Sequence, residues 1–232
     1  MARILVISHE PEAAPAMIGE LLEERGQDLR RHVVLADPER PDVGYPDPDQ
    51  FAAVISFGSF ASAYAASARA WVEPEIDLIR RLVDEEQPFL GICFGGQLLA
   101  ESLGGHVERA PQEEHEVGLV TFDDDGALPF PAGPWFTWHE DRVVLPEGTD
   151  VLAHNGRAVQ CFRHGVAVGT QFHPEADAAL ISSWVRIGPD HVPAHTTGER
   201  LVGEVDAHHA QLRQNCERLV DWFLADVAGI DA

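Results

Sequence analysis

The chain contains no lysine. Its 16 basic residues are all arginine and stand against 39 acidic residues, which gives a net charge of −23 over 232 residues. With so few cations the chain offers no basic stripe that could displace the counterions of a nucleic acid, so we expect no nucleic-acid partner. A phosphate-binding glycine-rich loop with its lysine is absent for the same reason. The composition predicts a solvated, strongly anionic surface.

Cysteines and long apolar runs are also scarce. The three cysteines are too few for a disulfide framework, which fits a reducing compartment. No apolar run reaches 18 residues, and the chain opens with a strand-like segment rather than a signal peptide. We therefore expect a cytoplasmic protein with no membrane partner.

The apolar pattern of the first half predicts an α/β fold. Short apolar runs alternate with segments of helical periodicity, such as Val72, Ile76 and Ile79 within residues 71–86. This alternation predicts a doubly wound, mostly parallel sheet with helices on both faces and functional groups at the carboxyl ends of the strands. The buried strands are expected at residues 3–8, 32–36, 51–57 and 88–92.

After Gly105 the pattern changes to short alternating strands, which predict an antiparallel extension at the edge of the sheet. We expect one domain over residues 1–190 and a C-terminal helical extension over 191–232 that packs on it. The additional strands are expected at 116–122, 141–145, 151–153, 158–162 and 166–172, and helices at 176–187 and 207–228.

Cys93 lies in a small-residue turn between an apolar run and a helix-like segment. Gly91 and Gly95 stand two residues before and after it, which is the spacing of a nucleophile elbow, where a bulky neighbour would clash with an exposed nucleophile. A helix that begins at Phe94 directs its free N–H groups at Cys93 and favours the thiolate over the thiol. The alternative is a buried cysteine that acts as a small apolar residue, as we expect for Cys161.

A second motif follows 80 residues later, where the predicted strand 166–172 ends at His173. Pro174 fixes the following turn and directs Glu175 back toward the histidine. A thiolate needs a proton acceptor, and an imidazole needs a carboxylate on its other nitrogen. Cys93, His173 and Glu175 are therefore a candidate nucleophile, base and orienting group.

The pair of motifs resembles the class I, triad-type glutamine amidotransferases, and in particular the glutaminase domain of GMP synthase. The family elbow reads Gly-Ile-Cys-Phe-Gly-His-Gln; here it spans 91–97 with Gly96 in place of the histidine, and the His-Pro-Glu motif spans 173–175. The resemblance implies a flavodoxin-like fold. Further matching segments are residues 104–107, 116–118, 138–141, 145–148 and 160–163.

The nucleophile elbow assigns one oxyanion donor to the backbone N–H of Phe94. The resemblance implies a second donor at Ser59, in a loop that reads Gly-Gly-Pro in relatives and Gly58-Ser59-Phe60 here. This departure places a side chain where the family has glycine. The resemblance further implies that the α-amino and carboxylate groups of the substrate are held by Gly58, Gln97, Thr137, Trp138 and His139.

Three functions are compatible with these residues. The favoured one is a glutaminase that delivers ammonia to a separate synthase. The second is a γ-glutamyl peptide hydrolase with the same triad, and the third is a non-catalytic interaction module. We expect no cofactor and no metal, since the adjacent His208 and His209 do not share a helix face with each other. An apolar last helix is consistent with a homodimer.

Overall fold

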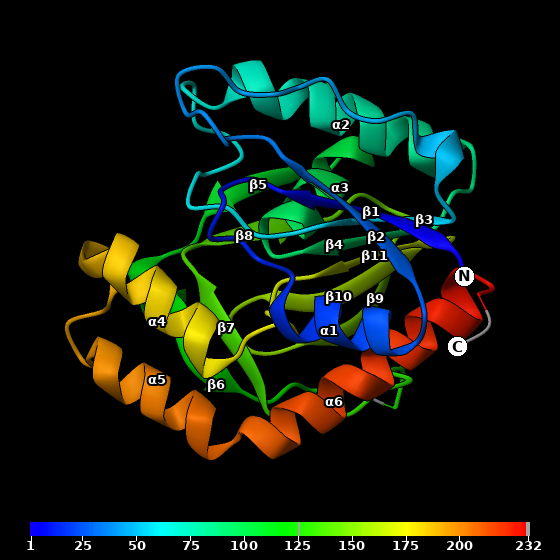
Figure 1. Cartoon of the computed structure of the whole chain (residues 1–232). Coiled ribbons are helices and arrows are strands. Elements are labelled where there is room, and N and C mark those ends of the chain that lie inside the picture. The colour runs from blue at the N-terminus through cyan, green and yellow to red at the C-terminus, as the bar shows by residue number, and fades with distance from the viewer. Residues whose placement is uncertain (125, 231–232) are drawn as a thin grey trace.

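A computed structural model describes residues 1–124 and 126–230 (Figure 1). Its centre is a seven-stranded sheet with the order β2-β1-β3-β4-β11-β10-β9. The strands from β2 to β11 in this order are parallel, and β10 and β9 add an antiparallel edge, which confirms the predicted fold class. The strands are β1 (Arg3–Ser8), β2 (Asp28–Val33), β3 (Ala53–Ser56), β4 (Phe89–Ile92), β9 (Asp150–His154), β10 (Val159–His164) and β11 (Ala167–Thr170).

Helices cover both faces of this sheet, because its inner strands are apolar on both sides. Along β1, Ile4 and Val6 pack into one apolar cluster and Leu5 and Ile7 into the other. Figure 1 shows α2 (Arg69–Asp84) and α3 (Phe94–Ser102) on one side of the sheet, and α1 (Ala16–Glu24) and α6 (His209–Trp222) on the other. The remaining helices are α4 (Ala178–Ile187) and α5 (Gly198–Ala207), with short helical turns at Pro48–Gln50, Gln112–Glu114, Pro189–His191 and Phe223–Val227.

The sequence pattern predicts that the strands after Gly105 extend the main sheet, and the two predicted at 116–122 and 141–145 do not. β5 (His106–Arg109) pairs with β8 (Asp141–Val144), and β6 (Glu116–Val120) pairs with β7 (Trp135–His139), each as a separate two-stranded sheet. β5 and β7 were not predicted as strands, because β5 is short and mostly polar and β7 is rich in aromatic residues without alternation. β11 is central and parallel to β4 rather than part of the antiparallel edge.

Two further expectations need correction. The second strand begins at Asp28 rather than His32, because backbone pairing with β1 recruits polar residues that no apolar pattern marks. The predicted helix 207–228 begins at His209, as α6 followed by the turn Phe223–Val227, and α5, which ends at Ala207, was not predicted. Within the part of the chain described, no helix has both the length and the apolar character that crossing a membrane requires.

Candidate active site

Cys93 occupies a strained turn between β4 and α3. Its backbone has φ 50° and ψ −102°, a region that non-glycine residues rarely adopt. The glycines explain why this turn forms: a Cβ on Gly95 would lie 2.3 Å from the carbonyl oxygen of Ser56, and one on Gly91 would lie 2.5 Å from Gly95. Only glycine at both positions lets the helix start this close to the sheet, which presents the sulfur at the carboxyl end of β4.

The sheet order brings His173 to Cys93. β11 is the immediate parallel neighbour of β4, with Thr170 opposite Ile92, so the segments that follow the two strands leave the sheet at the same edge. The N–H of Cys93 donates to the Thr170 carbonyl at 2.7 Å and holds the two strand ends together. A Cβ on Gly58 would lie 3.1 Å from Cε1 of His173 and 4.0 Å from Cβ of Cys93, so the two side chains meet beside this glycine.

Glu175 orients the His173 ring. Nδ1 of His173 and Oε1 of Glu175 are 2.8 Å apart, and both residues are buried. Burial lowers the pKa of His173, but the Glu175 carboxylate and the Cys93 side chain favour the charged ring and raise the pKa to about 10. The Trp184 ring, from α4, packs edge-to-face with the imidazole, with 4.8 Å between ring centroids.

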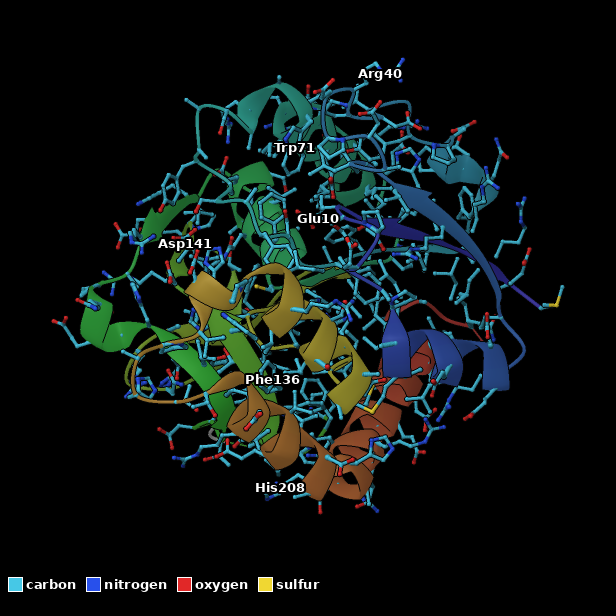
Figure 2. All side chains as sticks on the ribbon, turned by 60° about the vertical axis from the view of Figure 1, so that its left-hand side comes forward. Glu10, Arg40, Trp71, Phe136, Asp141 and His208 are labelled. Atoms are coloured by element: carbon cyan, nitrogen blue, oxygen red, sulfur yellow. The ribbon has the colours of Figure 1, made fainter. Side chains whose placement is uncertain are left out.

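A cleft of about 190 Å³ opens above these groups. Loops at the carboxyl ends of β1, β3 and β4 line it, together with β7, β8 and α4. Glu10 and Asp141, both labelled in Figure 2, lie on its wall. Within the described residues, the backbone N–H groups of Ser59 and Phe94 donate no hydrogen bond, so both can serve a ligand in the cleft.

The predicted substrate-binding residues differ in their placement. Gly58, Gln97, Trp138 and His139 line the cleft, whereas Thr137 is fully buried and does not. Gln97 lies near Gln171, with 3.5 Å between Nε2 and Oε1.

Both ring nitrogens of His139 already have hydrogen-bond partners within the protein. Its Nδ1 lies 3.0 Å from the Asp141 carbonyl, and its Nε2 lies 3.2 Å from Glu116, which also accepts from Asn155 and Gln160. The imidazole is therefore part of a buried network that fixes the cleft wall.

Sequence reasoning missed several groups around the site. Gln171 directs its amide nitrogen at the Cys93 sulfur, 3.5 Å away. His9 and Glu10 directly follow β1, so they lie at the carboxyl end of a strand, where functional groups are expected. Glu75 is fully buried on α2 among its apolar positions, and an acid on an apolar helix face was a signal in the sequence.

Comparisons with known proteins identify the family that this chain resembles. A family model described as glutamine amidotransferase class-I matches residues 18–181. A glutamine-hydrolysing GMP synthase subunit from Methanocaldococcus jannaschii is 34% identical over 113 residues, which are 44% of this chain and 60% of that protein. The GMP synthase of Pyrobaculum aerophilum is 32% identical over 182 residues, 75% of this chain and 33% of that protein. The chain thus spans less than two thirds of these curated relatives.

Solved structures match over almost the whole chain. A glutamine amidotransferase from Thermotoga maritima has a TM-score of 0.82 at 25% identity, covering 96% of this chain and 97% of that one. A glutamine amidotransferase from Methylobacillus flagellatus has a TM-score of 0.83 at 21% identity, covering 98% and 96%. The second likeness concerns the fold alone.

Proposed function

This chain belongs to the glutamine amidotransferase class-I family of enzymes, and on that premise we propose that it hydrolyses the side-chain amide of glutamine through a thioester on Cys93. The observation that carries the proposal is the meeting of three groups from two adjacent strand ends. Cys93 follows β4, His173 follows β11, and Glu175 lies 2.8 Å from the His173 ring.

In the first step the Cys93 sulfur attacks the amide carbon. His173, whose raised pKa keeps the ring protonated at neutral pH, gives its proton to the departing nitrogen. The C–N bond breaks, ammonia leaves, and a γ-glutamyl thioester remains on Cys93. In the second step neutral His173 takes a proton from water, the hydroxide attacks the thioester, and glutamate leaves as the thiolate returns.

The tetrahedral intermediate of each step carries a negative oxygen. We assign its stabilisation to the backbone N–H groups of Phe94 and Ser59, two residues that line the cleft together with Cys93 and His173. Loss of one such donor costs about 3 kcal/mol of barrier in comparable enzymes. The Glu175 carboxylate holds the ring in the orientation that directs Nε2 at the sulfur, and it stabilises the imidazolium.

We further propose that the ammonia passes to a separate synthase. This part is supported by the relative in Methanocaldococcus jannaschii, which is named as one subunit of a glutamine-hydrolysing GMP synthase. For the present chain we propose only the class of the acceptor, which is a synthase that consumes ammonia.

The test is turnover of L-glutamine by the purified chain, followed as ammonia and glutamate release. Cys93→Ala is expected to lower turnover by about 10³-fold or more. Cys161→Ala is the matched control, since burial raises the pKa of that thiol to about 12 and leaves it unreactive. Turnover that survives Cys93→Ala would contradict the proposal. Cleavage of γ-glutamyl dipeptides without glutamine turnover would favour the peptide hydrolase instead.

A further inference from the structure

A buried histidine and glutamate lie beside the catalytic groups without belonging to the triad. Nε2 of His9 and Oε2 of Glu75 are 2.9 Å apart, and neither side chain is exposed to solvent. The other ring nitrogen, Nδ1, lies 3.0 Å from the carbonyl oxygen of Gly58. The pair therefore connects α2 to the loop after β3, which forms one wall of the cleft.

The hydrogen-bond partners indicate that His9 is a cation. Both of its ring nitrogens face acceptors, a carbonyl and a carboxylate, so both nitrogens act as donors. Glu75 also accepts from the hydroxyls of Ser56, at 2.7 Å, and Tyr45, at 3.1 Å, as an ionised carboxylate does. Burial lowers the pKa of His9, but Glu75, the Glu10 charge and the Gly58 carbonyl together outweigh this effect and the pKa is raised.

The Gly58 carbonyl that His9 binds belongs to the same peptide group as the Ser59 N–H. In a trans peptide the C=O and the N–H point in opposite directions, so a bond that fixes one also aims the other. A cationic donor on the carbonyl oxygen also withdraws electron density and makes the N–H a stronger donor. We propose that the His9–Glu75 ion pair positions and polarises the Gly58–Ser59 peptide group for its role as the second oxyanion donor. The inference rests on the function proposed above.

Glu10 supplies a second anchor for the same loop. Its Oε1 accepts the Ser59 hydroxyl at 2.8 Å and the Phe60 N–H at 3.3 Å. The family resemblance assigns Gly-Gly-Pro to this loop, and here Ser59 and Phe60 replace the second glycine and the proline. His9 and Glu10, which follow β1, thus hold a loop that lacks the proline. His9 binds the Gly58 carbonyl, and Glu10 binds the Ser59 hydroxyl and the Phe60 N–H.

The test compares kcat for glutamine with the rate at which Cys93 is alkylated. Glu75→Gln keeps the size of the side chain but removes the charge that keeps His9 protonated. We expect kcat for glutamine to fall about tenfold, because the donor remains but is less polarised, while KM changes by less than about twofold. The rate of Cys93 alkylation by iodoacetamide should also stay within about twofold, since this displacement forms no oxyanion.

Two further variants separate positioning from structural support. His9→Asn combined with Glu75→Gln leaves no buried charge unpaired, and kcat should fall no further than in Glu75→Gln alone, because the pair acts as a unit. Val72→Ala, on the same helix and fully buried, loosens the packing but keeps both residues of the ion pair, and it should leave kcat nearly unchanged.

Three results would overturn the inference. The first is an unchanged kcat in Glu75→Gln. The second is a loss of alkylation rate in Glu75→Gln as large as its loss of kcat. The third is a loss of kcat in Val72→Ala equal to that in Glu75→Gln when the two variants are equally stable. A wild-type chain that alkylates at Cys93 but turns over no glutamine would refute the proposed function and, with it, this role of His9.

Discussion

Glu175 and His173 are only two residues apart, yet both are buried and bonded at 2.8 Å, since Pro174 turns the chain between them. At the scale of single residues this contact decides which ring nitrogen faces the sulfur. Glu175→Gln should keep the shape but lose the charge that raises the pKa of His173. We expect kcat for glutamine to fall by about 10² to 10⁴-fold with KM little changed, measured by steady-state kinetics.

Glu101→Gln is the control for that variant. Glu101 lies on α3, the helix that begins after Cys93, but it pairs with Arg69 at 2.8 Å rather than with His173. Its replacement should change kcat by less than about twofold, because a partly exposed ion pair contributes little. Equal losses in the two variants would contradict the orienting role of Glu175.

At the scale of an element, α4 connects fold stability to the site. The Asp177 carboxylate caps this helix by accepting the Leu180 N–H at 2.7 Å, and Trp184 on the same helix packs against His173. Asp177→Ala should lower the free energy of unfolding by about 1 kcal/mol, measured by urea denaturation. Because the loosened helix carries Trp184, kcat should fall several-fold as well.

Thr197→Ala offers a matched comparison. Thr197 caps α5 through the Arg200 N–H at 3.2 Å, and α5 contributes no residue to the cleft. The loss of stability should again be about 1 kcal/mol, but kcat should not change. If both variants lose activity equally, global stability rather than the α4 contact governs catalysis.

At the scale of the whole molecule, the net charge of −23 sets a repulsive field over the surface. Raising the salt concentration from about 0.01 to about 0.15 M shortens the screening length from about 30 to about 8 Å. Surface ion pairs such as Arg213 with Glu24 weaken under the same change, but acids outnumber bases more than twofold. We expect the free energy of unfolding to rise with salt, measured with urea, a neutral denaturant.

The comparison of sodium and potassium chloride completes that test. Screening depends on ionic strength alone, so the two salts should stabilise the chain equally. A gain with only one salt would indicate specific ion binding, and a loss with both would mean that the surface ion pairs outweigh the repulsion.

Local patterns predicted the elements that depend on neighbouring residues. The elbow glycines, the helix that begins at Phe94 and the strand before His173 all follow from steric rules within a few residues. The second strand was predicted four residues late, and β5 and β7 were not predicted, because their residues are held by pairing with distant strands. Such pairing overrides local preference.

The sequence by itself determined which residues could perform the chemistry, since the spacing around Cys93 and the His-Pro-Glu motif are local and chemically specific. Only the tertiary structure decided how they are supported. The order of strands in the sheet places β11 beside β4, and the packing of α2 places Glu75 on His9. These contacts join residues 66 to 78 positions apart in the chain. They arise from burial of both faces of one sheet, a property that no short stretch of sequence contains.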